Sequence, residues 1–242
     1  MKQPWRSFDR VAAEYDEARP SYPDRILELL PLGGAATVLD LGAGTGKLTQ
    51  VLARRYPHVI AVEPLDAMRA VLERVVPEAD ARAGAAEAIP LADASVDAVF
   101  AAQAYQWFAN DRAVAEIARV LRPGGVFAIV TNEPVEPLPL PEAYSERLRQ
   151  VFAATKVHAR FGDESAFEPI ERGPFGRLHS GRVDHEQVQT RELVLKFASS
   201  LSPIARLPDD ERAAVEADLA ALLPEGEYTF TVRATVRWTI RQ

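Results

Sequence analysis

The sequence predicts an α/β fold in which a mostly parallel β-sheet is covered by helices on both faces. The first observation is that short apolar runs alternate with amphipathic helical patterns between residues 37 and 131. The second is that these runs are continuously apolar, as in strands of a parallel sheet that are buried on both faces. The third is a glycine-rich turn directly after the first run. Together they predict a ligand-binding edge at the carboxyl ends of the strands.

Each element of this core has its own local signal. The helices show apolar residues three and four positions apart, and proline ends the first two of them. The strands are short apolar runs bounded by turn residues or by a helix. Strands are expected at 37–41, 58–62, 80–84, 96–102 and 126–131, helices at 48–56, 66–76 and 111–121, and a turn at 122–125.

The pattern changes after residue 131, where four prolines interrupt the chain between 134 and 141. Strict alternation of apolar and polar residues over 228–240 then predicts a half-exposed strand, antiparallel at the sheet edge. We expect a single domain over 1–242. Its expected parts are a helical lid at 1–28, a ligand-binding α/β core at 29–134, an insertion over the site at 135–205, and a closing helix with the edge strand at 206–242.

Composition excludes several classes of site. The chain of 242 residues has no cysteine, so disulfides, thiolate metal sites and cysteine nucleophiles are excluded, and no metal site is expected. Its net charge of −7 argues against a broad nucleic-acid interface. No apolar stretch is long enough to span a membrane, and the first residues are not expected to act as a signal peptide. A cytoplasmic protein without membrane or nucleic-acid partners is expected.

The glycine-rich turn Gly42-Ala43-Gly44-Thr45-Gly46 carries the main functional signal. An NTP-binding P-loop is rejected because Leu48 stands where that motif needs a serine or threonine after the lysine. The dinucleotide pattern G-x-G-x-x-G fits incompletely, so NAD remains a weaker alternative. Glycines let a ligand approach the backbone, and the following helix offers free N–H groups to a carboxylate. With Asp40 available for a cationic amine, the turn suits a ligand that carries both groups.

A second acidic residue, Glu63, ends the next apolar run, 23 residues after Asp40 (63 − 40). A carboxylate at this position can accept hydrogen bonds from both hydroxyls of a ribose. The alternative is a surface acid at a strand end. The combination of turn, spacing and strand context favours the ribose interpretation.

The stretch 38–132 resembles the class I S-adenosylmethionine-dependent methyltransferases of the type 11 group. The matching segments are VLDLGAGTGKLT (38–49), VIAVEP (59–64), AGAAEAIPLADASVDAVFAAQAYQWF (83–108) and VLRPGG (120–125). The opening FDRVAAEYDEARPSYP (8–23) and the run AYQWF (104–108) are similar to small-molecule enzymes of the trans-aconitate methyltransferase type. The resemblance implies a Rossmann-like, seven-stranded sheet, S-adenosyl-L-methionine as cofactor, and a small-molecule acceptor.

The resemblance also implies roles for individual residues. The glycine turn and Asp40 would hold the methionine part, and Glu63 the ribose. Ala85 stands where the family often has an aspartate for the adenine amine, so adenine recognition would rest on Ala86 and Glu87. The implied cofactor-binding residues are Tyr15, Arg19, Asp40, Gly42, Ala43, Gly44, Thr45, Glu63, Pro64, Leu65, Met68, Ala85, Ala86, Glu87 and Gln103. Aromatic residues after the fourth strand, Tyr105, Trp107 and Phe108, are the candidates for acceptor binding; packing of Trp107 is the competing interpretation.

The expected chemistry is in-line displacement of an activated methyl group, to which the protein contributes alignment and exclusion of water. A carboxylate acceptor would be ionised already and would need no general base, whereas a hydroxyl or carbon acceptor would need one. No catalytic residue is assigned. The alternatives are an RNA methyltransferase and a non-catalytic module that binds the cofactor. The protein is expected as a monomer or homodimer.

Overall fold

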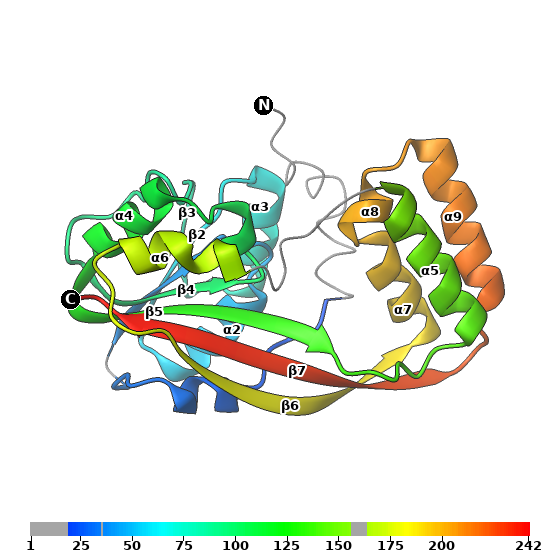
Figure 1. The fold of residues 1–242 in the computed structure, drawn as a ribbon, viewed down its shortest axis with the longest axis horizontal. Helices are drawn as coiled ribbons and strands as arrows, with labels where there is room; N and C mark the ends of the chain where they lie inside the picture. The colour runs from blue at the N-terminus through cyan, green and yellow to red at the C-terminus, as the bar shows by residue number, and fades with distance from the viewer. Residues whose placement is uncertain (1–18, 35, 156–163) are drawn as a thin grey trace. The chain divides into compact units, whose positions relative to one another are not determined.

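The computed structural model describes residues 19–34, 36–155 and 164–242. Seven strands form one sheet with the order β3-β2-β1-β4-β5-β7-β6. Figure 1 shows β5, β7 and β6 side by side. The strands β3, β2, β1, β4 and β5 are parallel to one another, which confirms the expected mostly parallel sheet. The bounds are β1 (Thr37–Leu41), β2 (His58–Val62), β3 (Asp80–Arg82), β4 (Val96–Ala102), β5 (Leu121–Pro134), β6 (His179–Thr190) and β7 (Glu227–Ile240).

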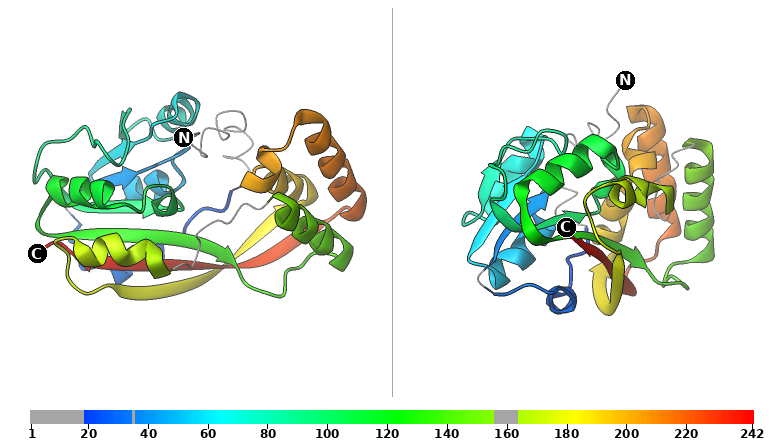
Figure 2. Two further views of the ribbon diagram at one scale, coloured as in Figure 1. Left: turned by 45° about the horizontal axis from the view of Figure 1, so that its top comes forward. Right: turned by 60° about the vertical axis from the view of Figure 1, so that its left-hand side comes forward.

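Helices pack on both faces of the parallel strands (Figures 1 and 2). Alternate residues of one strand point to opposite faces, so Val38 packs toward α2 while Leu39 packs toward α4. These elements belong to one compact unit, the core unit, whose described residues are 21–34, 36–133, 164–184 and 233–242. Its helices are η2 (Asp24–Leu29), α2 (Lys47–Arg55), α3 (Asp66–Val75), η3 (Tyr105–Trp107), α4 (Asp111–Val120), η4 (Glu164–Phe167) and α6 (Glu168–Arg172).

A second compact unit, the helical unit, comprises the described residues 19–20, 134–155 and 185–232. It has its own apolar cluster, in which Tyr144, Val194, Ile204 and Leu219 are buried. Its helices are α5 (Glu142–Thr155), α7 (Arg191–Ser199), α8 (Ser202–Ala205) and α9 (Asp209–Leu222).

The carboxyl-terminal strands differ from the sequence-based prediction. The sheet has the expected antiparallel edge, but the edge strand is β6, which was not predicted and falls within the expected insertion at 135–205. Strand β7, expected at the edge, is paired on both sides. The sequence of β6, HSGRVDHEQVQT, is mostly polar and every residue in it keeps some exposure, so it lacks the apolar pattern that identifies a strand.

Two smaller boundaries also differ. The turn expected at 122–125 is instead part of β5, opposite a register shift between Val96 and Ala98 of β4. The third strand ends at Arg82 rather than at residue 84. Of the helical lid expected at 1–28, residues 1–18 lie outside the described residues, and Ile26 and Leu27 of η2 are buried in the core unit. Within the described ranges, no helix is both long and apolar enough to cross a membrane.

Candidate functional site

The glycine-rich turn connects β1 to α2 at the carboxyl edge of the sheet. Gly42 and Gly44 have φ angles of 71° and 57°, in the left-handed region that favours glycine. A Cβ on Gly42 would lie 2.9 Å from Cβ of Ala104, whereas a Cβ on Gly44 would have no atom of residues 19–34, 36–155 or 164–242 within 4 Å. The turn is therefore packed against the protein at Gly42 and open at Gly44.

Glu63 joins this turn to the loop after β2. Its side chain is almost fully buried, and its Oε2 accepts a hydrogen bond from the Gly44 N–H at 2.8 Å. Its Oε1 accepts from the Leu65 N–H at 2.9 Å. Both carboxylate oxygens are thus oriented by backbone N–H groups. This arrangement places a fixed carboxylate between the two loops that follow neighbouring strands.

Asp40 lies on the α2 side of β1 and is 1% exposed. Its Oδ2 accepts a hydrogen bond from the Thr49 hydroxyl at 2.7 Å, while its Oδ1 has no hydrogen-bond partner among the described residues. Burial raises the pKa of Asp40 to about 7, the hydrogen bond from Thr49 opposes the rise, and the charge of Glu63 adds to it. A buried carboxyl of this kind gains from a cationic ligand group.

A second polar cluster lies where β4 ends. Gln103 is a non-glycine residue with a φ of 52°, a strained conformation of the kind often found at functional sites. Its amide nitrogen donates to the backbone carbonyl of Asn132 at 2.6 Å, and the amide nitrogen of Asn132 donates to the carbonyl of Ser21 at 3.0 Å. These carbonyls accept only, so the orientation of both amides is determined. The buried amide oxygens of Gln103 and Asn132 have no partner within the described part of the chain.

The residues expected around the adenine differ in exposure, and one of them is already hydrogen-bonded within the protein. Leu65 and Met68 are buried, and Pro64 is exposed. Ala85 is exposed and Ala86 is buried. The Glu87 carboxylate accepts a hydrogen bond from the side chain of Asn110, the residue that caps α4, at 3.0 Å. The role of Glu87 in adenine recognition stays a prediction, and the structure shows a second role for it in fixing the start of α4.

The three aromatic residues after β4 have different environments. Tyr105 is 2% exposed, and its ring contacts those of Phe108, Phe127 and Phe167. Phe108 is buried as well, and a Cβ on Gly42 would lie 3.5 Å from its ring. Trp107 is partly exposed. Tyr105 and Phe108 are thus buried in the apolar cluster of the core unit, and Trp107, which packs against the same cluster, keeps partial exposure.

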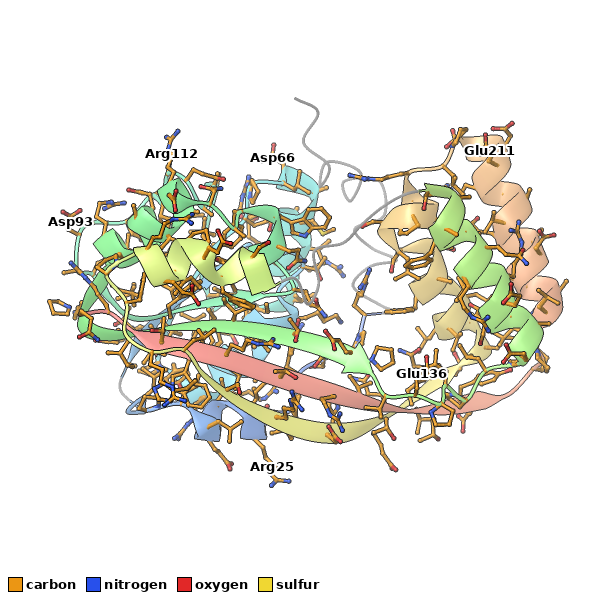
Figure 3. The ribbon with its side chains drawn as sticks, in the orientation of Figure 1. Arg25, Asp66, Asp93, Arg112, Glu136 and Glu211 are labelled. Carbon is orange, nitrogen blue, oxygen red and sulfur yellow. The ribbon has the colours of Figure 1, made fainter. Side chains whose placement is uncertain are left out.

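The two residues expected from the lid are not placed at the turn by the structure. Tyr15 lies outside the described residues. The Arg19 guanidinium donates to the carbonyl of Ser200 at 3.2 Å and lies over the Phe197 ring at 5.0 Å, all within the helical unit. The role of both residues toward the cofactor stays a prediction. Charged residues elsewhere on the core unit, such as Arg25, Asp93 and Arg112, project outward (Figure 3).

The residues around the turn fit a ligand with a ribose and an amino-acid tail. Buried oxygens without a partner among the described residues are Asp40 Oδ1, Thr45 Oγ1 and Gln103 Oε1, which could accept from an ammonium group. Open space at Gly44 and the start of α2 suit a carboxylate. No group of three or more His, Asp or Glu side chains within the described ranges has a metal-binding arrangement.

Two residues of this region were missed by the sequence analysis. Thr49 was treated only as part of the motif that resembles the family, although it is fully buried against Asp40. Asn132 is a polar residue directly after the apolar run of β5. A polar side chain at the end of a strand is the sequence signal that could have identified it as a site residue. Both roles depend on contacts with another strand or segment, which spacing within one element does not reveal.

Several known proteins are similar to this chain in sequence or in structure. Residues 39–129 match the family model described as a methyltransferase domain. An uncharacterized methyltransferase of Mycobacterium tuberculosis (strain ATCC 25618 / H37Rv) is 38% identical over 196 residues, covering 81% of this chain and 76% of the relative. The chain belongs to this methyltransferase family. It is a class I methyltransferase and an enzyme that uses S-adenosylmethionine as its cofactor.

Other methyltransferases extend the comparison. A solved structure from Anaeromyxobacter dehalogenans, described as a type II methyltransferase, superposes with a TM-score of 0.66 at 27% identity, covering 93% of this chain and 97% of that one. A malonyl-[acyl-carrier protein] O-methyltransferase of Methylococcus capsulatus is 42% identical over 130 residues, which is 51% of this chain and 46% of that protein. The second match is confined to about half of each methyltransferase.

Proposed function

We propose that this methyltransferase transfers the methyl group to a small-molecule acceptor, and that the acceptor is a carboxylate. The observation that carries the cofactor part of the proposal is the Glu63 carboxylate, held by Gly44 N–H at 2.8 Å and Leu65 N–H at 2.9 Å. The acceptor class is supported by the partial similarity to O-methyltransferases that act on a malonyl group. The net charge of −7 disfavours a nucleic-acid acceptor.

The cofactor would be held by residues at the carboxyl ends of β1 and β2. Glu63 would accept hydrogen bonds from the ribose hydroxyls through the two carboxylate oxygens that the Gly44 and Leu65 N–H groups orient. Asp40 and Gln103 would accept from the ammonium group, and the turn with the first N–H groups of α2 would bind the carboxylate. Leu65 and Met68 would supply apolar surface for the adenine.

The bound cofactor supplies a methyl group on a positively charged sulfur, already activated for displacement. The protein then has to orient the acceptor and to exclude water from the reacting atoms. An ionised carboxylate needs no proton removed, so the scheme requires no general base. Trp107, the partly exposed aromatic residue after β4, is the proposed contact for the acceptor.

Replacing Glu63 with glutamine tests the cofactor site. Glutamine keeps the length of the side chain but loses the charge and one acceptor oxygen. We expect S-adenosylhomocysteine to bind about 10- to 100-fold more weakly, because a ribose hydroxyl loses a charged acceptor and the two loops lose part of their link. Isothermal titration calorimetry on the full chain measures the change.

The exposed Glu78→Gln variant is the matched control, since it removes the same charge from the surface just after α3. It should bind as the unsubstituted chain does. Equal affinity of the Glu63→Gln variant and the unsubstituted chain would overturn the role of Glu63. Failure of the unsubstituted chain to bind S-adenosylhomocysteine would overturn the whole site.

The acceptor class is tested by measuring S-adenosylhomocysteine formation with a panel of small carboxylic acids, phenols and primary amines, and with total RNA. Turnover with carboxylic acids, with base-sensitive methyl esters as products, is the expected result. Turnover confined to amines, phenols or RNA would overturn the proposed class.

A further inference from the structure

The buried pair formed by Asp40 and Thr49 is the feature of the core unit that the cofactor assignment leaves unexplained. Thr49 lies on α2, is 0% exposed, and its hydroxyl donates to Asp40 Oδ2 at 2.7 Å. The other oxygen of Asp40 has no partner among the described residues. One oxygen of the carboxyl is thus anchored, and the other retains its capacity to accept.

A hydroxyl at this position has an energetic cost that packing alone does not justify. The neighbouring buried positions of α2, Leu48, Val51 and Leu52, carry aliphatic side chains, and valine has nearly the shape of threonine. A buried hydroxyl is unfavourable unless it makes a hydrogen bond, and the bond it makes here is to a carboxyl that is itself costly to bury. The pair therefore points to a role for the charge on Asp40.

We propose that Thr49 is a positioning residue of the cofactor site: it anchors one oxygen of Asp40, favours the ionised carboxylate, and thereby directs the other oxygen to the ammonium group of the cofactor. The inference rests on the proposed role of Asp40 in binding that group. It adds that Thr49, a buried residue of α2 that does not contact the ligand, controls the affinity for the amino-acid tail.

The proposal has a consequence for pH dependence. Burial raises the pKa of Asp40 to about 7, the hydrogen bond from Thr49 opposes this rise, and Glu63 is the charged residue whose field adds to it. The ammonium group pairs with the ionised form, so affinity is highest above pH 7 and is lost as the pH falls through about 7. Without the Thr49 hydroxyl the pKa of Asp40 rises further, and the same loss occurs at higher pH.

Calorimetric titrations of the full chain between pH 5.5 and 8.5 test this, with Thr49→Val to remove the hydroxyl and Thr49→Ser to keep it. Two ligands are compared. S-adenosylhomocysteine carries the ammonium group, and 5′-methylthioadenosine lacks the whole amino-acid tail. For S-adenosylhomocysteine and the unsubstituted chain, the association constant should fall by up to about tenfold per pH unit below pH 7.

The Thr49→Val variant should bind S-adenosylhomocysteine about fivefold more weakly at pH 7, with the midpoint of its pH profile about one unit higher, as expected for removing one hydrogen bond to a charged group. Thr49→Ser should follow the unsubstituted chain. Binding of 5′-methylthioadenosine should not change with Thr49→Val or across this pH range, because that ligand has no ammonium group to pair with Asp40.

The results that would contradict the role of Thr49 can be distinguished from failure of the proposed function. Coincident pH profiles for Thr49→Val and the unsubstituted chain would overturn the inference while leaving the cofactor site intact. Equal weakening of both ligands at every pH would show that Thr49 acts only by packing, and would also overturn it. Absence of S-adenosylhomocysteine binding to the unsubstituted chain would instead overturn the proposed function on which it rests.

Discussion

Replacing Gly44 with alanine is expected to leave the protein folded and to weaken S-adenosylhomocysteine binding by about 10- to 100-fold, or about 1–3 kcal/mol. No atom of the described residues lies within 4 Å of the position that the new methyl group would take, so the methyl group clashes with none of them. The positive φ of 57° costs alanine about 1–2 kcal/mol of folding free energy. The methyl group would instead project into space that the proposed cofactor occupies. Urea denaturation and calorimetry measure the two effects separately.

Gly42→Ala is the matched comparison within the same turn. Its φ of 71° carries a similar strain, but its Cβ would lie 2.9 Å from Cβ of Ala104. The expected loss of folding free energy is therefore larger, about 2–4 kcal/mol. Wild-type affinity in the Gly44→Ala variant, or equal destabilisation by the two substitutions, would contradict this account of the turn.

Replacing Asp40 with asparagine is expected to stabilise the ligand-free protein at pH 8 and to weaken cofactor binding. The pKa of Asp40 is raised from 3.8 to about 7 by burial. Between these values the unfolded chain has lost a proton that the folded chain keeps, so the stability contributed by this group falls as the pH rises through that window. A rise of about three units corresponds to about 4 kcal/mol above pH 7.

Asparagine carries no charge and can still accept the hydrogen bond from Thr49. The free energy of unfolding should therefore increase by about 2–4 kcal/mol at pH 8 and by clearly less at pH 5, as measured by urea denaturation. S-adenosylhomocysteine affinity should fall by about tenfold or more, because the ammonium group loses its charged partner. A destabilised variant at pH 8, or a gain that does not depend on pH, would refute the assignment of a buried, charged Asp40.

The parallel half of the sheet could be predicted from local sequence because its strands are continuously apolar. The runs at 37–41 and 58–62 match β1 and β2, and the helical spacing around Val71 and Leu72 matches α3. By contrast, β6 has few apolar residues and is held by pairing with a strand almost 50 residues away in sequence, as the ion pair between Asp184 and Arg233 illustrates. A strand of that kind has no local pattern to detect.

The candidate site could likewise be predicted only in part from local sequence. The positions of the glycine turn and of Glu63 could be predicted, because each directly follows a strand with a clear apolar signal. The partners of Glu63 could not, because Gly44 is 19 residues away and its N–H becomes available only when β1 and β2 pair in register. The burial of Tyr105 also depends on rings from β5 and from η4, which no spacing around residue 105 reveals.

Taken by itself, the sequence determined the parallel α/β core, the order of its strands along the chain, and the acidic residues Asp40 near the end of β1 and Glu63 directly after β2. Those features follow from periodicity and from interactions between residues a few positions apart. Such interactions do not depend on contacts between distant segments. Tertiary structure alone decided which strand lies at the sheet edge, which oxygen of Asp40 is left to accept, and which aromatic residue stays exposed. These outcomes depend on contacts between distant segments and on the exclusion of water when those segments pack.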